Sequence, residues 1–510
     1  MTSLSTGSRQ THIDPAPRRT DLDPTWWRIS AAWILIAAAL LRFYDLDLKP
    51  LHHDEGVNGF FLVNLIRSSA AYRYDPANYH GPSLYYFARA SVALFGLTTV
   101  AIRFVPAFFG MMTIAVVLSW RQRLGAIGSL AAAALLALSP GAVYMSRYFI
   151  HETLLVCFTF AAVAAFARYV ESNRALDLVL TGAALGLMFV TKETWVISVG
   201  VAVVAIVGTV ILMNADAMAT FRSRRDASAA RGLKAAVPVV AALTVFAGIG
   251  VIFFSSFFTH PEGITDAVKS FLPWARTGSS AHLHPWGTYV VWIAQEEPFI
   301  LALAAVGIRF ALMSRDNAFG LFAALWAVGM LLAYSLIPYK TPWLTLNLIA
   351  PLSVIAGFGV DQLWLRGSRA ARSIMTAVAA SLCLVVAVQA VRLNFIHYDD
   401  PAYPYVYVHT QRDLLRLVAD VDEAAQTHAP TTARLRVTVM SPHQFPLSWY
   451  LRNFDVGYYD HVVPTRDAVI IGALPQDEEL ASMFGQSYDR KDDYALRPGV
   501  RLVLYVRRTK

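Results

Sequence analysis

Runs of roughly 20 apolar residues recur between Ile29 and Ala390, each separated from the next by a short polar loop. A helix of that length crosses the hydrocarbon core of a bilayer, which is about 30 Å thick. Of the 510 residues, 56% are hydrophobic and 15% are charged, which is too apolar for a soluble protein of this size. The sequence therefore predicts a polytopic α-helical membrane protein. The expected spanning segments are residues 28–44, 102–120, 124–142, 150–167, 176–191, 195–213, 236–257, 287–308, 318–337, 343–364 and 373–390.

A further apolar run, residues 83–97, has only 15 residues, or about 22 Å as a helix, and contains Arg89. If this run lies on the membrane surface, the loops rich in Arg and Lys all fall on the side of the N-terminus, and such loops face the cytoplasm. These loops are residues 121–123, 168–174, 222–234, 309–315 and 366–372. We therefore expect about 11 transmembrane helices in the plasma membrane, with residues 1–27 as a cytoplasmic tail. The net charge of +8 is then explained by the Arg and Lys residues of the cytoplasmic loops, and no nucleic-acid partner is expected.

The loops left on the outer face contain the unusual polar residues of the chain. They are LHHDEG at 51–56, NYHGPSLYY at 78–86, YMSRYFIHET at 144–153, VTKETW at 190–195, THPEG at 259–263, AQEEP at 294–298 and IPYKTPW at 337–343. The first of them belongs to a long external loop, residues 45–101, whose segment EGVNGFFLVNLIRSS has an amphipathic pattern. Loops that are distant in sequence are thus expected to meet on one face and to assemble a site.

The C-terminal part of the chain, residues 392–510, differs from the rest. An amphipathic segment, QRDLLRLVADVDEAAQ, is followed by the strand-like segments RLRVTVM, DAVIIG and GVRLVLYVRR. Helical and strand periodicities alternate there. We expect residues 28–391 to form the transmembrane domain, and residues 392–510 to form a small α/β domain on the outer surface.

Asp54 and Glu55 lie in the first external loop, shortly after the first predicted helix. Ionised side chains at the membrane edge are costly, so they need a partner or a purpose. One interpretation is a general base or a metal ligand held at the membrane surface. The other is that they are solvated loop residues, with Asp54 as the N-cap of the amphipathic helix.

Two further outer loops combine cations with carboxylates. The segment SRYFIHET contains Arg147, His151 and Glu152, and the segment TKETW contains Lys192 and Glu193. Each set can bind a substrate, or can form ion pairs within itself.

Three more residues are candidates for substrate binding. Tyr339 and Lys340 lie between two prolines that interrupt the helices, and irregular backbone at this depth usually lines a cavity or is buried in protein. His80 precedes Gly-Pro and an aromatic pair, a position that also fits an ordinary turn before an interfacial aromatic belt.

Taken together, these residues predict an outward-facing site with carboxylates and cations at head-group depth. Such a site suits a lipid-linked phosphate substrate, because a phosphate leaving group needs cations rather than a proton donor. A carboxylate can then take the proton of an acceptor hydroxyl. No cofactor is expected, although a divalent metal held by Asp54, Glu55 and Glu152 is an alternative.

The order of these motifs resembles the GT-C superfamily of glycosyltransferases that use polyprenyl-phosphate sugars, including its protein O-mannosyltransferase and aminoarabinose-transferase branches. The acidic pair of the first external loop, HGP-LYY, an Arg followed by P-FFG at 103–110, and LSPGAVYMSRYFIHET at 138–153 are similar to the motifs of that superfamily. The segments TKETW, YKTPWL, YVYVHTQRDLLRLV and FPLSWYLRN resemble the branch named flippase activity-associated protein, from archaeal-type N-glycosylation clusters.

This resemblance implies a GT-C fold and roles for particular residues. Asp54 matches the acidic residue taken as catalytic base, with Glu55 as its neighbour, and Glu152 matches a second acidic position. His80 stands where aminoarabinose-type enzymes have a Lys. We expect catalytic roles for Asp54, Glu55 and Glu152. Substrate binding is expected for His80, Arg147, His151, Lys192, Glu193, Tyr339 and Lys340.

The expected function is that of an inverting glycosyltransferase, which moves a sugar from a polyprenyl (dolichyl) phosphate to a lipid, glycan or protein acceptor on the outer face. Its partners are then the lipid-linked donor, membrane lipids and an unknown acceptor. Two alternatives remain open at this point. One is a lipid-linked-sugar translocase or its accessory protein, and the other is a metal-dependent enzyme that uses pyrophosphate-linked glycans.

Overall fold

The computed structural model describes residues 22–67, 72–78, 80–213, 218, 236–280, 282–428 and 435–508. Within them, eight helices are long and apolar enough to cross a membrane. These are α1 (Pro24–Phe43), α4 (Thr99–Ser119), α8 (Glu152–Ser172), α10 (Trp195–Leu212), α12 (Ala236–Phe254), α17 (Ala318–Leu336), α18 (Leu346–Arg366) extended by η2 (Pro342–Thr345), and α19 (Arg369–Val391) extended by η3 (Arg392–Ile396). The chain is therefore a multi-pass membrane protein.

Two other spans are broken. Helices α6 (Ala126–Leu138) and α7 (Pro140–Ser146) meet at 62°, and α15 (Thr288–Glu296) and α16 (Pro298–Ser314) meet at 111°. A proline opens the second helix of each pair, where it lacks an N–H to continue the first. A shorter apolar helix, α9 (Ala175–Phe189), has 15 residues. With it, each of the 11 segments predicted from the sequence coincides with a helix or with a bent pair.

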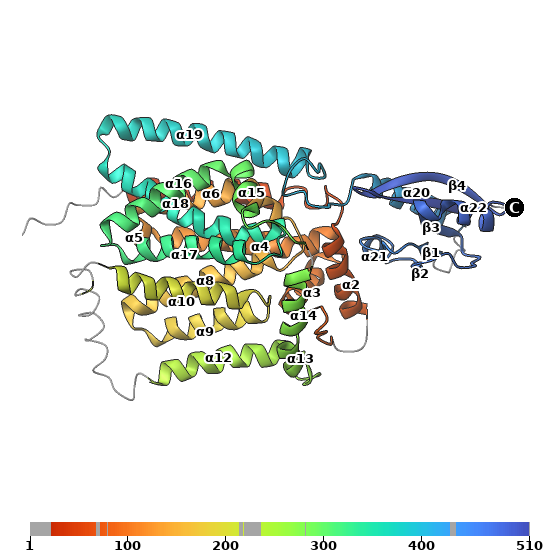
Figure 1. The fold of residues 1–510 in the computed structure, drawn as a ribbon, viewed down its shortest axis with the longest axis horizontal. Helices are drawn as coiled ribbons and strands as arrows, with labels where there is room; N and C mark the ends of the chain where they lie inside the picture. The colour runs from red at the N-terminus through yellow and green to blue at the C-terminus, as the bar shows by residue number, and fades with distance from the viewer. Residues whose placement is uncertain are drawn as a thin grey trace, which may run out of the picture.

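Figure 1 shows the long helices side by side in one bundle. Helix α18 is almost wholly buried, whereas α10, α12 and α19 are largely exposed on the flanks. Small residues allow close packing around α18, as in other membrane bundles. A Cβ atom on Gly357 would lie 2.4 Å from the carbonyl oxygen of Gly128, so α6 and α18 touch through their backbones.

Short helices lie at one end of the bundle, and there α2 (His53–Arg67) and α14 (Phe271–Ser280) run across the direction of the long helices (Figure 1). With them are α3 (Ser83–Phe95) and α13 (Gly263–Lys269). Helix α3 has 13 residues, about 20 Å, and is not among the helices long enough to span. That the run at 83–97 does not cross the membrane stays a prediction. At the opposite end lies α5 (Arg121–Leu124).

Beyond the short helices stands a separate α/β unit with a mixed five-stranded sheet in the order β2-β1-β3-β5-β4. Strand β1 is parallel to β2 and β3, whereas β5 is antiparallel to β3 and β4. Helix α20 (Asp413–His428) covers one face, and α22 (Asp477–Phe484), preceded by η4 (Leu474–Gln476), covers the other. The strands are β1 (Arg436–Met440), β2 (Asp455–Tyr459), β3 (Val469–Ala473), β4 (Tyr488–Arg497) and β5 (Val500–Arg507). The predicted small α/β fold is confirmed.

This C-terminal unit is fastened to the bundle through α21 (Leu447–Tyr450), which packs on α2. Trp449 is buried in the core of the bundle end, and its indole N–H donates to Oγ1 of Thr99 at 3.2 Å. The hydroxyl of Tyr450 accepts the backbone N–H of Leu51 at 2.9 Å. Helix α2 is therefore held between the bundle and the C-terminal unit.

Candidate functional site

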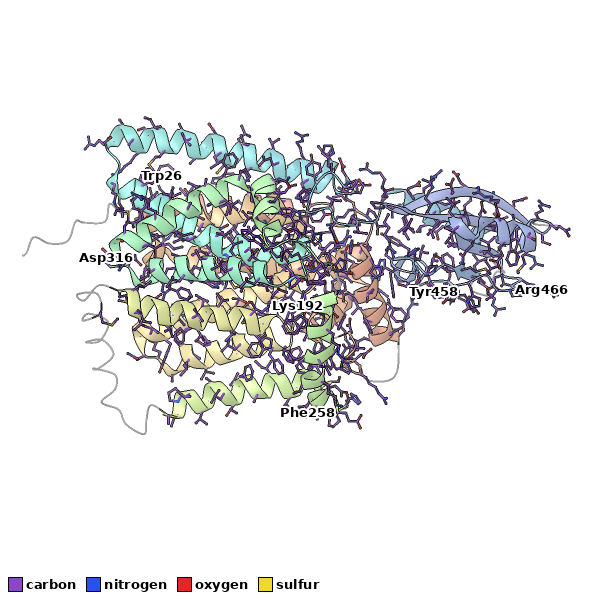
Figure 2. The ribbon with its side chains drawn as sticks, in the orientation of Figure 1. Trp26, Lys192, Phe258, Asp316, Tyr458 and Arg466 are labelled. Atoms are coloured by element: carbon purple, nitrogen blue, oxygen red, sulfur yellow. The ribbon has the colours of Figure 1, made fainter. Side chains whose placement is uncertain are left out.

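A cavity of about 930 Å³ opens where the bundle, the short helices and the C-terminal unit meet. That volume suits a small-molecule ligand. Figure 2 places Lys192, one of its lining residues, at this end of the bundle, while Asp316 lies at the opposite end. Seven of the ten residues expected in the site line this cavity: Asp54, His80, His151, Glu152, Lys192, Glu193 and Tyr339.

Asp54 lies in the first turn of α2, one residue after the helix begins. Its backbone N–H donates to Nδ1 of His52 at 3.1 Å, so the His52 ring, rather than Asp54, caps the helix. Burial lowers the pKa of His52, and the accepting Nδ1 carries no proton. The carboxylate of Asp54, 37% exposed, is 4.0 Å from that ring. Among the described residues, it is the one cavity carboxylate that accepts no hydrogen bond, whereas Glu152 binds Lys192 and Glu193 binds His80.

Glu55 turns away from the cavity. Its carboxylate is fully buried and accepts two N–H groups of Arg103 at 2.7 Å each. It also accepts the backbone N–H groups of His52 and Phe149, at 3.0 and 2.9 Å. Burial opposes ionisation, but the Arg103 guanidinium outweighs it and lowers the pKa of Glu55. Because Arg103 also binds carbonyl groups of residues 46–50, the pair fixes the loop that presents Asp54.

Arg147 and Lys340 also lie outside the cavity lining and bind the ends of helices. The guanidinium of Arg147 donates to backbone oxygens at the C-terminus of α1, among them that of Tyr44 at 2.5 Å. The ammonium of Lys340 donates to the oxygens of Ser335 and Ile337, at 3.0 and 2.5 Å, at the end of α17. Helix ends leave carbonyl groups unsatisfied, and a cation complements the helix dipole there. Both residues thus complete helix ends.

Glu152 and Lys192 form a buried ion pair on the cavity wall. Glu152 opens α8, where the helix dipole favours a carboxylate, and Lys192 lies in the loop between α9 and α10. Burial opposes the charge on Lys192, but Glu152 and Glu193 outweigh it and raise its pKa. This cation is therefore charged and held in place at the cavity.

His80 and Glu193 form a second pair, with 2.9 Å between Nδ1 and Oε2. Residues 80–82 bring them together because Gly81 lies against the end of α9, where a Cβ atom would be 2.2 Å from the carbonyl oxygen of Val190. Burial opposes ionisation of Glu193, but His80 and Lys192 lower its pKa. His151 packs on His80 with ring centroids 4.9 Å apart. Burial lowers the pKa of His151 well below its usual value.

Other lining residues were not predicted as site residues, although Asn78 and Tyr407 lie in the motifs NYHGPSLYY and YVYVHTQRDLLRLV. Asn58 and Asn78 are linked through the hydroxyl of Tyr85, which lies 3.0 and 3.1 Å from their side chains. Tyr407, from the segment before α20, places its hydroxyl 3.0 Å from Nδ1 of His282. Arg497 comes from the end of β4. Asparagine and tyrosine are common in any sequence, and only the fold brings these to the cavity.

The three carboxylates considered as metal ligands do not gather at one point. Glu55 binds Arg103, Glu152 binds Lys192, and Asp54 stands apart from both pairs. Across the described residues, no group of three or more His, Cys, Asp or Glu side chains has a metal-binding arrangement. The residues present do not fit the divalent site that the sequence left open.

The cavity thus combines Asp54, a carboxylate without a hydrogen-bonded partner among the described residues, with Lys192, a cation held by Glu152, and with Arg497. Such an arrangement can remove a proton from a hydroxyl group at Asp54. It can also stabilise negative charge that develops on a leaving group beside Lys192.

Comparison with known proteins agrees with this architecture. Residues 79–249 match the sequence model of a family described as dolichyl-phosphate-mannose-protein mannosyltransferase. The fold is similar to crystal structures of ArnT from Cupriavidus metallidurans. The form bound to undecaprenyl phosphate has a TM-score of 0.64 at 17% identity, over 95% of this chain and 98% of that one. The apo form has a TM-score of 0.61 at 16% identity, over 94% and 97%.

No curated protein gives a significant sequence match. The chain shares the fold of ArnT over almost its whole length, which confirms the predicted GT-C fold.

Proposed function

We propose that this protein is an inverting glycosyltransferase, which transfers a sugar from a polyprenyl phosphate to an acceptor hydroxyl, with Asp54 as the general base. One observation carries the proposal: Asp54 is the cavity carboxylate without a hydrogen-bonded partner in the described chain, while Glu152 and Glu193 are hydrogen-bonded to Lys192 and His80. The match of residues 79–249 to a dolichyl-phosphate-mannose family supports the donor class. So does the shared fold with ArnT, which was solved with undecaprenyl phosphate.

In the proposed reaction, Asp54 takes the proton of the acceptor hydroxyl while the acceptor oxygen attacks the anomeric carbon of the sugar. The bond from that carbon to the phosphate oxygen breaks, and the polyprenyl phosphate leaves with the bonding electrons. Attack opposite the leaving group inverts the anomeric configuration. Lys192 and His80 are the groups proposed to bind the phosphate, each held by a carboxylate.

The remaining predicted residues have supporting roles in this scheme. Glu152 and Glu193 position Lys192 and His80, and His151 and Tyr339 line the donor side. Glu55, Arg147 and Lys340 shape the loops and helix ends around the cavity without touching it. From the motifs TKETW and YKTPWL, we also propose membership of the flippase-associated branch of the superfamily.

The test uses purified full-length protein in proteoliposomes containing a polyprenyl-phosphate sugar labelled in the sugar. We expect wild-type protein to release or transfer the sugar, and Asp54→Asn to do so about 100- to 10,000-fold more slowly. Binding of undecaprenyl phosphate should persist in the variant, because the asparagine leaves Lys192 and His80 in place. Asp316→Asn, at the opposite end of the bundle, is the matched control and should react at the wild-type rate.

Wild-type rates in Asp54→Asn would remove Asp54 as the base. Movement of the donor head group across the bilayer, without any cleavage of the sugar bond by wild-type protein, would instead indicate a translocase.

A further inference from the structure

Arg497 is a cation that the C-terminal unit contributes to the cavity. It is the last residue of β4, half-buried, and it lines the cavity together with His53 and Asp54 of α2. The hydrogen bonds of its guanidinium go to two ring nitrogens, Nδ1 of His53 at 3.4 Å and Nδ1 of His443 at 2.8 Å. A guanidinium is always a donor, so both ring nitrogens accept and carry no proton.

The Arg497 cluster, which we define as Arg497, His53 and His443, therefore holds a positive charge that, among the described residues, no carboxylate contacts. Burial lowers the pKa of both histidines, so they are neutral at pH 7. In the described part of the chain, Arg497 has no carboxylate in ion-pair contact, and Asp54 is the acid whose charge acts on it. A half-buried arginine bound only to neutral groups keeps donors available for an anion.

The cavity has two cationic regions of different character. Around Lys192, the cation is paired with Glu152, and His80 is bound to Glu193. Around Arg497, no carboxylate of the described residues forms an ion pair with the guanidinium, and Asp54 is the acid whose charge acts on it. The molecule that loses its proton to Asp54 must lie beside Asp54, on the side of the Arg497 cluster.

We propose that the Arg497 cluster binds an anionic group of the acceptor, a phosphate or a carboxylate, and so selects acceptors that carry such a group. This inference rests on the proposed role of Asp54 as the base for the acceptor hydroxyl. The C-terminal unit is then the part of the protein that recognises the acceptor, while the bundle end binds the donor.

The test measures equilibrium binding to full-length protein in nanodiscs by calorimetry, with three probes. Octyl glucuronide carries a carboxylate, octyl glucoside is its neutral counterpart with the same alkyl chain, and undecaprenyl phosphate reports on the donor side. We expect wild-type protein to bind the glucuronide about tenfold more tightly than the glucoside, as one charge-assisted contact would give. Arg497→Gln should abolish that preference, and Arg497→Lys should retain part of it.

The matched control is Arg490→Gln, because Arg490 lies on the same strand but is bound to Asp477. It should keep the wild-type preference, and undecaprenyl phosphate should bind Arg497→Gln within about twofold of wild type. A tenfold loss of undecaprenyl phosphate binding in Arg497→Gln would overturn the inference, because the anion would then be the donor phosphate. Equal affinity of wild-type protein for both octyl sugars would overturn it as well.

These readouts are binding affinities, so they do not depend on whether the proposed transfer reaction takes place. Loss of sugar transfer in Asp54→Asn tests the reaction, whereas the charge preference of Arg497→Gln tests the acceptor site.

Discussion

Asp54 and Glu55 are neighbours in the chain but have opposite environments. Successive residues of an α-helix point about 100° apart, so one side chain of the pair faces the cavity while the other faces the protein core. Asp54 is partly exposed, and Glu55 is fully buried on Arg103. The adjacent acids therefore divide into a residue that faces the cavity and a residue that holds the loop.

The buried pair should matter for stability. Glu55→Gln leaves the Arg103 charge buried without a counter-ion, and breaking a buried pair in this way typically costs about 3–5 kcal/mol. We expect a clearly lower Tm for the variant, measured by intrinsic fluorescence in one detergent. The control is Glu171→Gln, which removes a 49% exposed partner of Arg123 and should cost about 0–1 kcal/mol. Equal Tm values for the two variants would contradict the structural role of Glu55.

The sequence could identify these residues only up to a point. Charge at a membrane edge is costly, and that reasoning found Asp54, Glu152 and Lys192. The same reasoning selected Arg147 and Lys340, because a cation that completes a helix end has the same sequence signal as one that faces a cavity. Arg497 gave no signal, since a single arginine in a domain outside the bilayer is ordinary.

At the scale of elements, α2 links the candidate base to the C-terminal unit. On one face of α2, two glycines pack against α21 and against Pro446, the residue that precedes α21. A Cβ atom on Gly56 would lie 2.6 Å from Cα of Pro446, and one on Gly59 would lie 2.8 Å from the ring of Trp449. The same helix presents Asp54 at its first turn, so the docking of α21 also fixes the position of Asp54 relative to Arg497.

Gly56→Ala should loosen this docking. The added methyl group meets backbone, which cannot rotate away, although alanine in a helix is otherwise favoured by about 0.5–1 kcal/mol. We expect faster hydrogen exchange across residues 443–453 in the variant than in wild-type protein. Gly200→Ala in α10 is the control, because nothing lies within 4 Å of its new Cβ atom, and exchange there should be unchanged. If hydrogen exchange in Gly56→Ala were as slow as in wild-type protein, the contact between α2 and α21 would tolerate a side chain at position 56.

The elements themselves were largely predictable, because the length of an apolar run is a local property. Each predicted span has a helix in the structure, and Pro140 and Pro298 mark the two breaks. The angles of 62° and 111° at those breaks were not predictable, since they depend on how each second helix packs against others. The docking of α21 on α2 joins residues about 390 positions apart, and no local pattern encodes it.

For the whole molecule, the two ends of the bundle differ in their residues: one carries the basic helix α5 and the other carries the cavity. Figure 1 shows α5, with Arg121 and Arg123, at the end opposite the cavity and the C-terminal unit. Figure 2 places Trp26 and Asp316 at that same end, and Tyr458 and Arg466 beyond the other. The basic segment 222–234 lies outside the described residues. From the positive-inside rule, we propose that the end with α5 faces the cytoplasm and that the cavity lies outside.

This orientation predicts which positions a membrane-impermeant maleimide can reach. In a background in which Cys157 and Cys383 are replaced by alanine, we expect Asp460→Cys, whose native side chain is 80% exposed, to be labelled in intact cells. Asp316→Cys, also at an exposed position, should be labelled only after the cells are permeabilised. The reverse pattern would put the cavity in the cytoplasm. Labelling of both positions in intact cells would mean that the two ends do not lie on opposite sides, and that the bundle spans the membrane differently.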